Sequence, residues 1–148
     1  MESELSFRPF SNADTDACLA IFDANCPAFF APNERADYES FLATSPEGYE
    51  VGEADGRVVA AFGLTRGDRP GARLSWIMLN PDSKGLGLGS SIMKRVISHG
   101  RAAGAPLIRI AASHKSADFF ARFGAVARQH TRDGWGPGMD RVDMELPL

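Results

Sequence analysis

The sequence predicts an α+β fold with a mixed, mostly antiparallel sheet of about seven strands and about four helices. Apolar residues recur at helical spacing in the first third of the chain and alternate at strand spacing from Tyr49 onward. A glycine-rich stretch, 85–89, then separates the last of these strands from a strongly amphipathic helix. The 148 residues are the usual size of one domain, so we expect a single domain over residues 1–148.

The first third predicts one short strand and two helices. Alternating apolar residues at 5–7 are typical of a strand, which a proline ends. Ser11 and Asp14 have the spacing of a capping box, and the apolar stripe behind them predicts a helix up to Pro27. Asn33 can cap a second helix, which a Ser-Pro-Glu-Gly segment closes.

The middle of the chain predicts three consecutive antiparallel strands. Tyr49 and Val51 begin the first strand, and the runs 58–65 and 73–79 form the others, with glycine-containing turns between them. Because 58–64 is apolar on both faces, we expect a central strand that is covered on both sides.

The last third returns to helical spacing before the final strands. Four apolar residues at 92–97 share one helix face, and Gly104 is a typical residue to end that helix. The remaining predicted elements are a strand at 107–111, a helix at 116–123, strands at 125–131 and 139–146, and a long hairpin loop at 133–138.

Composition excludes several classes of function. The net charge of −3 and the scattered basic residues argue against nucleic acid as a partner. The acidic first residues lack the features of a signal peptide, and no apolar stretch is long enough for a membrane span, so we expect a cytoplasmic protein with no membrane partner. Cys18 and Cys26 form no CxxC pair, and we expect neither a disulfide framework nor a metal site.

The glycine-rich stretch carries the strongest chemical signal. In Lys84-Gly85-Leu86-Gly87-Leu88-Gly89, backbone N–H groups and the dipole of the following helix favour a bound pyrophosphate. A Walker loop needs Lys-Ser or Lys-Thr after its last glycine, where this chain has Ser90-Ser91, and no complete G-x-G-x-x-G pattern is present. A tight turn before a helix would also explain the glycines.

The segment from Ile77 to Gly89 resembles the acyl-CoA loop of the GNAT superfamily of N-acetyltransferases, Gln/Arg-x-x-Gly-x-Gly/Ala, with its preceding strand. Residues 117–124 are similar to the helix that follows the fifth strand in that family, with an aromatic pair and a closing glycine. The order of predicted elements also matches almost the whole chain. The resemblance implies an acyltransferase that uses acetyl-CoA as acyl donor, without a metal.

In that family the fourth and fifth strands separate, and the pantetheine arm of the donor lies between them. The resemblance implies that the backbone of Ile77 and Leu79 pairs with the pantetheine amides, and that the Leu79 N–H polarises the thioester carbonyl. The implied donor-binding residues are Ile77, Leu79, Lys84, Gly85, Leu86, Gly87, Leu88, Gly89, Ser90, His114, Phe120 and Arg122.

The chain departs from the family pattern at two of these positions. Lys84 replaces the usual Gln or Arg and keeps a cation. Phe120 stands where the family has the tyrosine that protonates the leaving thiolate. The sulfur then leaves as a free thiolate, which a thiol pKa near ~8.5 permits, or Ser113 or His114 protonates it.

The base that takes the proton from the acceptor amine is less clear from the sequence. Many relatives place an acid on the fourth strand, where this chain has Ser75 and Trp76. His130 is the titrating group that we expect in a catalytic role, with Glu34 and Asp133 as alternatives. An isolated histidine is, however, more often a residue of the surface.

The acceptor pocket implied by the resemblance lies between the first two helices and the final hairpin. The chain places aromatic residues there, which suit a partly apolar or a cationic amine. The same aromatics could simply complete the core. The candidate acceptor-binding residues are Phe29, Phe30, Tyr38, Trp76 and Trp135.

These features predict an N-acetyltransferase, a monomer or homodimer, that transfers an acetyl group directly to a primary amine of a small molecule or peptide. The absent tyrosine and the absent strand acid also fit a non-catalytic protein of the same fold that binds or senses acyl-CoA. A third interpretation is an acyltransferase for longer acyl chains or for hydroxyl acceptors.

Overall fold

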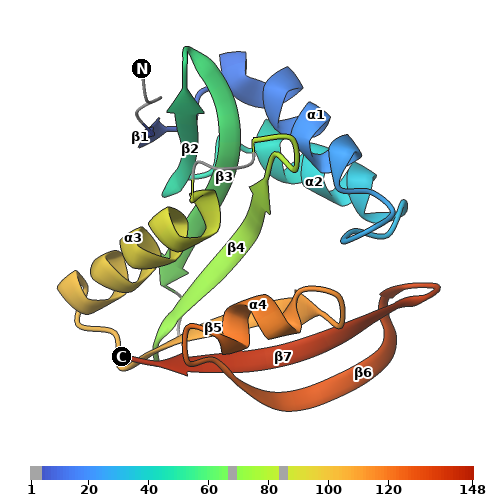
Figure 1. Ribbon diagram of the computed structural model, residues 1–148, viewed down its shortest axis with the longest axis vertical. Coiled ribbons are helices and arrows are strands. Elements are labelled where there is room, and N and C mark those ends of the chain that lie inside the picture. The colour runs from blue at the N-terminus through green and yellow to red at the C-terminus, as the bar shows by residue number, and fades with distance from the viewer. Residues whose placement is uncertain (1–4, 67–69, 84–86) are drawn as a thin grey trace.

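The computed structural model describes residues 5–66, 70–83 and 87–148 (Figure 1). The described strands form one seven-stranded sheet in the order β1-β2-β3-β4-β5-β7-β6, in which only β4 and β5 run parallel. The predicted α+β fold with a mixed, mostly antiparallel sheet is confirmed. In chain order the elements are β1 (Ser6–Pro9), the 3-10 helix η1 (Asn12–Asp14), α1 (Thr15–Ala24), α2 (Glu34–Ala43), β2 (Tyr49–Ala54), β3 (Arg57–Arg66), β4 (Ala72–Leu79), α3 (Leu88–Ala102), β5 (Leu107–Ser113), α4 (Ala117–Ala121), β6 (Val126–Gly136) and β7 (Met139–Pro147).

Helices cover both faces of the sheet (Figure 1). α1 and α2 pack on one face, where Phe22 and Ala61 belong to the same buried apolar cluster. α3 packs on the other face, where Ile92 lies in a second cluster with Ala60 and Phe62 of β3. Since neighbouring residues of β3 enter different clusters, this strand is buried on both sides, as its apolar run predicts.

The predicted capping pair closes a 3-10 turn before the first helix. The Asp14 carboxylate accepts the N–H of Ser11 at 2.9 Å, and α1 begins only at Thr15. Arg8 donates two hydrogen bonds to the same carboxylate and, as the largest cause, holds the pKa of Asp14 below its usual range. The start of α1 is thereby tied to β1.

The final hairpin differs most from the sequence prediction. β6 continues to Gly136, so the predicted loop at 133–138 was wrong in extent. The register of β6 against β7 shifts between Thr131 and Gly136, and there the Asp133 carboxylate accepts the N–H of Gly138 at 2.8 Å. Side-chain hydrogen bonds of this kind take the place of regular strand pairing here. The sequence therefore lacks the alternation of apolar and polar residues that would predict a strand.

β6 forms an edge of the sheet, and most of its residues are exposed.

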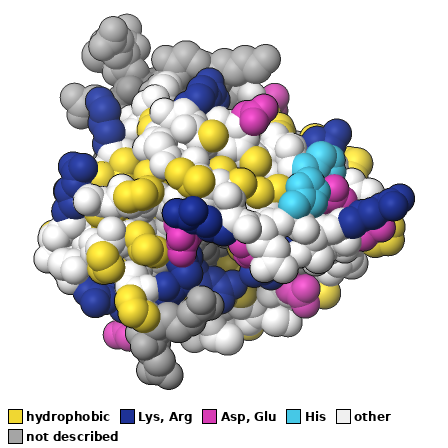
Figure 2. All heavy atoms as spheres, turned by 90° about the horizontal axis from the view of Figure 1, so that it is seen from below, with side chains coloured by type: hydrophobic (Ala, Val, Ile, Leu, Met, Phe, Trp, Pro, Cys, Tyr) yellow, Lys and Arg dark blue, Asp and Glu magenta, His cyan; other side chains and the backbone are white. Residues whose placement is uncertain are grey.

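On the side of the molecule drawn in Figure 2, basic side chains are spread among acidic and apolar ones rather than gathered in one patch. No helix in the described part of the chain is long and apolar enough to cross a membrane.

Candidate active site

β4 and β5 separate along their length and open the centre of the sheet (Figure 1). Among the described residues, their pairing is limited to Ala72–Leu74 against Ile108–Ile110. β4 still pairs with β3 as far as Leu79, and β5 pairs with β7 as far as Ser113. The inner edges beyond the shared pairs therefore present backbone groups to a gap, where another extended chain can bind.

A bulge turns β4 away from β5. Trp76 and Ile77 together oppose one residue of β3, at a shift in the register of the two strands. Trp76 has a φ of +44°, a left-handed conformation that is strained for a bulky side chain. The hydroxyl of Tyr49 donates to the Trp76 carbonyl at 2.6 Å and lies 2.8 Å from the hydroxyl of Tyr38. This buried tyrosine pair stabilises the bulge.

The end of β4 presents a backbone N–H to the gap. Asn80 donates its N–H to Val59 of β3 at 2.8 Å, and backbone groups alternate in direction along a strand, so those of Leu79 point away from β3. The carbonyl of Leu79 accepts a hydrogen bond from Asn25 at 2.8 Å, and the same side-chain amide donates to Ile21. Asn25 thus fixes this peptide edge while leaving the N–H of Leu79 to a ligand.

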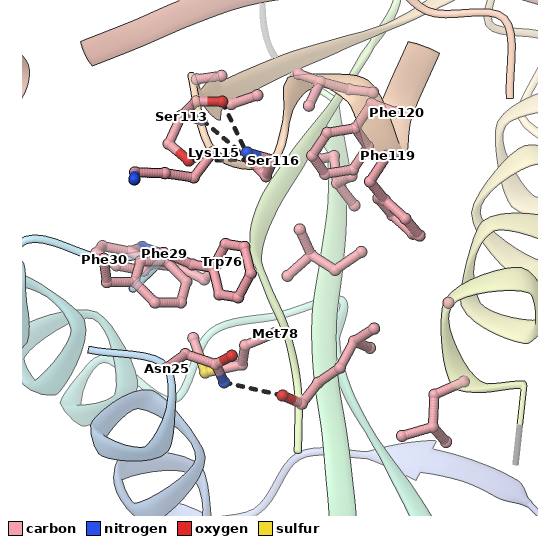
Figure 3. A pocket seen from close by; sticks show the side chains of 18 of the residues that line it. Asn25, Phe29, Phe30, Trp76, Met78, Ser113, Lys115, Ser116, Phe119 and Phe120 are labelled. Carbon is pink, nitrogen blue, oxygen red and sulfur yellow. Dashed lines mark hydrogen bonds between the residues drawn. The ribbon is translucent and has the colours of Figure 1, made fainter. Parts of the chain in front are cut away.

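A pocket of about 800 Å³ fills the gap (Figure 3). It extends from the segment between α1 and α2, through Phe29 and Phe30, to the start of α3 at Gly87 and Gly89. β4 and β5 line its centre, and α4 lines it through Phe119. The predicted donor and acceptor regions therefore meet in one continuous cavity.

The start of α3 closes one end of this pocket. Gly87 precedes the helix with a φ of +62°, and its carbonyl accepts the N–H of Ser91 at 3.0 Å. The N–H groups of 88–90 come before this first helical bond and lack a helical acceptor. This end of the pocket can bind an anion. The predicted residues Lys84, Gly85 and Leu86 lie outside the described residues.

α4 and the end of β5 form the wall next to α3. Phe120 is buried and Phe119 lies beside it, on the side of the pocket that faces α3 (Figure 3). The hydroxyl of Ser113 lies 3.1 Å from that of Ser116 and accepts the backbone N–H of Ser116. Ser113 lines the pocket, as Ser116 does.

Two other predicted donor contacts differ in position. Arg122 lines the pocket, with its guanidinium 5.7 Å from the centre of the Phe119 ring. His114 is not among the lining residues, and its Nδ1 accepts the backbone N–H of Asp140 at 3.0 Å. Lys115, which the sequence analysis did not single out, lines the pocket instead.

Aromatic side chains form the opposite wall. Phe29, Phe30 and Trp76 lie together on the side of α1 and α2 (Figure 3), and Trp135 also lines the pocket. The indole N–H of Trp135 donates to the Ala112 carbonyl at 2.9 Å, which orients the ring. Phe29 is 45% exposed, so it forms the rim rather than the core.

Tyr38 has a different position from the other predicted acceptor residues. It is fully buried, does not line the pocket and contacts Trp76 from behind, with ring centres 4.9 Å apart. Its place is the support of the aromatic wall.

Glu34 is the buried carboxylate of this wall. It lines the pocket with only 5% of its surface exposed, and one carboxylate oxygen accepts the N–H of Ala31 at 2.7 Å. Burial is the largest cause that raises the pKa of Glu34, against the opposing effect of the Ala31 hydrogen bond. A carboxylate held in this way can bind a cation or accept a proton.

The structure does not bring His130 to the pocket. Its side chain is 58% exposed, and its Nε2 lies 2.7 Å from the carboxylate of Asp140, on the final hairpin. Asp133 belongs to the same hairpin and is likewise absent from the pocket lining. Residue type alone does not show which titratable side chain reaches the pocket. Here the glutamate at the start of α2 does so, and the histidine on β6 does not.

Neither cysteine lines the pocket. Cys18 is fully buried, and burial raises the pKa of its thiol to about 11, which disfavours a nucleophilic thiolate. Both cysteines are free, and within the described ranges no three or more His, Cys, Asp or Glu residues are grouped to hold a metal ion.

Comparisons with known proteins agree with this geometry. A family model described as the acetyltransferase (GNAT) family matches residues 18–125. The fold is shared with a GCN5-related N-acetyltransferase from Rhodopseudomonas palustris (23% identity over 100% of this chain and 99% of that chain, TM-score 0.79). It is also shared with the ribosomal-protein-S18-alanine N-acetyltransferase from Escherichia coli (18%, 98% and 94%, TM-score 0.77) and with yncA from Salmonella typhimurium, solved with acetyl-CoA (21%, 99% and 95%, TM-score 0.69). No curated protein sequence gives a significant match.

Proposed function

The chain belongs to the acetyltransferase (GNAT) family, and from this premise we propose that it transfers the acetyl group of acetyl-CoA directly to a primary amine of a small molecule or peptide. The observation that carries the proposal is the gap between β4 and β5, which leads without interruption to the start of α3. A molecule with an extended amide-containing arm and a pyrophosphate matches both features.

The unpaired inner edge of β4 supports binding of the pantetheine arm. The backbone of Ile77 and the N–H of Leu79 lie where β5 no longer pairs, so we propose that they bind amides of the donor, while Asn25 holds the Leu79 carbonyl. The pyrophosphate would accept the N–H groups of 88–90 at the helix start. Phe119 and Phe120 offer an apolar wall to the arm.

The Leu79 N–H is the proposed donor to the thioester carbonyl. A neutral amine attacks the carbonyl carbon, negative charge develops on the oxygen, and the C–S bond breaks to release the thiolate of coenzyme A. One oriented donor at such an oxygen is worth about 3 kcal/mol. Asn25 contributes by holding the same residue through its carbonyl.

The thiolate leaves on the side of α4. Phe120 has no hydroxyl proton to donate, and we propose that Ser113, which lines the pocket there, hydrogen-bonds the sulfur. The ordinary thiol pKa near ~8.5 lets the group leave as thiolate close to neutrality. The acceptor amine approaches from the opposite, aromatic wall.

Calorimetric titration with acetyl-CoA tests the donor site, with Gly87→Glu and Gly104→Glu as a matched pair. Both glycines have positive φ, at +62° and +74°, and no atom of the described residues lies within 4 Å of an added Cβ at either position. The two variants therefore impose similar backbone strain at opposite ends of α3, and only Gly87 lines the pocket.

We expect binding in the wild type and in Gly104→Glu, and its loss in Gly87→Glu, where a carboxylate would repel the pyrophosphate. No binding by folded wild-type protein would falsify the proposal. Binding without coenzyme A release from any amine would instead favour the non-catalytic acyl-CoA-binding protein.

A further inference from the structure

We infer that Glu34 receives the acceptor ammonium and removes its proton, and that the acceptor is a cationic amine carried on an aromatic or otherwise apolar body. This inference rests on the proposed acetyl transfer and adds to it the substrate class and the base. It starts from a buried carboxylate that the reaction described so far does not use.

The surroundings of Glu34 are unfavourable for an isolated charge. The residue is 5% exposed, and its carboxylate receives one backbone hydrogen bond, from Ala31 to Oε2. In the described residues no buried side-chain oxygen or nitrogen lacks a partner, so Oε1, for which no hydrogen bond is found, is accessible. Glu34 lines the pocket, so its carboxylate group belongs to the cavity wall.

The aromatic wall explains why a cation with an apolar body would bind. Phe29, Phe30, Trp76 and Trp135 line the cavity that Glu34 lines. Aromatic faces attract a cation electrostatically and cover apolar surface at the same time. A carboxylate beside such faces selects an ammonium over a neutral polar group of the same size.

Glu34 is the carboxylate that shares the pocket lining with the aromatic side chains of this wall. Burial is the largest cause that raises the pKa of Glu34, and Asp37 on the same helix adds to it. The pKa of the Cys26 thiol is raised by burial first, then by Asp23 and by Glu34. Among the described residues, the other charged ones that line the pocket come from β4, from the segment after β5, and from α4 and its C-cap: Arg73, Lys115, Asp118 and Arg122.

Burial also favours the proton transfer. An ammonium and a carboxylate that are both taken out of water become a neutral amine and a neutral acid when the proton passes from nitrogen to Oε1. The amine then forms the N–C bond and the C–S bond breaks. Of the two protons that the ammonium loses, one protonates the coenzyme A thiolate and the other leaves Glu34 for solvent.

Binding of 2-phenylethylamine and of its neutral counterpart 2-phenylethanol tests the recognition step without acetyl-CoA. Trp76 and Trp135 line the pocket, so their fluorescence reports both ligands. We expect the wild type to bind the amine about 10- to 100-fold more tightly than the alcohol, as for a hydrogen bond to a charged group. Glu34→Gln keeps an oxygen for the N–H of Ala31 and removes the charge, and it should abolish this preference.

Kinetics test the proton transfer. At neutral pH Glu34→Gln should lower kcat/KM for the amine by about 10²- to 10⁴-fold and leave the Kd of acetyl-CoA unchanged. The wild-type profile should rise through the raised pKa of Glu34 and level off, whereas the variant should gain activity steadily toward the pKa of the free amine. Glu39→Gln, an exposed carboxylate of the same helix, serves as the control.

Two results overturn the inference: equal binding of amine and alcohol by the wild type, including no binding of either at millimolar concentration, or a Glu34→Gln variant with the wild-type preference and pH profile. A failure of the proposed acetyl transfer is distinct, because it would appear as absent acetyl-CoA binding while the fluorescence titration still reports on Glu34.

Discussion

At the scale of single residues, Asn25 ties the end of β4 to the end of α1. Its side-chain amide, at the end of α1, donates to the carbonyls of Ile21 and Leu79. One buried amide therefore couples the last turn of a helix to the peptide edge that faces the gap. Its position also explains why a polar residue is buried there, at 7% exposure.

Asn25→Ala should leave the Leu79 carbonyl without its partner. We expect the free energy of unfolding to fall by about 1–3 kcal/mol, since a buried acceptor loses its hydrogen bond. We also expect the Kd of acetyl-CoA to rise, because the neighbouring N–H is less well oriented. Urea unfolding and calorimetry measure the two effects, and Asn12→Ala, on an exposed hydrogen bond with Ser45, is the control.

An Asn25→Ala protein with unchanged stability and unchanged acetyl-CoA affinity would contradict this role. Lower stability with unchanged affinity would limit Asn25 to packing of α1.

Whereas Asn25 stabilises the fold, the buried charge of Glu34 lowers the free energy of unfolding. Its folded pKa is raised above the unfolded value, so both states are protonated at low pH and no cost arises there. As the pH rises from the unfolded pKa through the folded one, the unfolded state loses its proton first and the folded state is destabilised. Glu34→Gln should therefore be more stable than the wild type at pH 7 and not at pH 3.

Denaturant unfolding at both pH values measures this difference. A variant that is less stable at pH 7 would mean that the hydrogen bond to Ala31 outweighs the cost of burying the charge. Together with the loss of activity expected above, greater stability at pH 7 would identify a site held at the expense of the fold.

At the scale of elements, the two described glycines before and at the start of α3, Gly87 and Gly89, have different roles. Gly87 has a left-handed φ of +62°, and no atom in the described part of the chain would crowd an added Cβ there. Gly89 has ordinary helical backbone, but an added Cβ would lie 2.7 Å from the ring of Phe119. The first glycine permits the turn, and the second lets α3 approach α4 beside the pocket.

Gly89→Ala should consequently affect binding more than folding. The methyl group displaces the Phe119 ring, which lines the pocket, while alanine favours the helix by about 1 kcal/mol. We expect a higher Kd for acetyl-CoA and little loss of stability. The double variant Gly89→Ala/Phe119→Leu should recover part of the affinity; an unchanged Kd in Gly89→Ala would contradict the packing argument.

At the scale of the whole molecule, the pocket between β4 and β5 is lined by residues of both apolar clusters. One cluster includes Met78 and the α1–α2 side, and the other includes Ile110, Phe120 and the α3 side. A ligand that bridges β4 and β5 therefore contacts both halves of the core. Binding should stabilise the fold as a unit.

Thermal unfolding with acetyl-CoA measures this coupling. At a concentration of 100 times Kd, binding contributes about 2.7 kcal/mol, which corresponds to a rise in Tm of about 5–10 °C for a chain of this size. We expect the rise in the wild type and in Gly104→Glu, and none in Gly87→Glu. An equal rise in both variants would place the donor elsewhere.

The sequence by itself determined the features that depend on local periodicity and backbone chemistry. The continuous apolar run of β3, the apolar face of α3 and the glycines before that helix are properties of neighbouring residues, so the order of elements and the family resemblance could be predicted from them. The limits of the sheet between Thr131 and Gly136 could not, because side-chain hydrogen bonds replace alternation there.

The tertiary structure alone decided which side chains share the pocket. Several of its contacts join residues from different elements, and no local pattern encodes them. Glu34 is buried, Asn25 donates a hydrogen bond to the Leu79 carbonyl, and Tyr49 donates one to the Trp76 carbonyl. His130 was the expected base because histidine is a common proton acceptor in catalysis, yet its strand directs it to the surface. Residue type sets what a side chain can do, but packing sets the solvation and the neighbours that decide whether it does so.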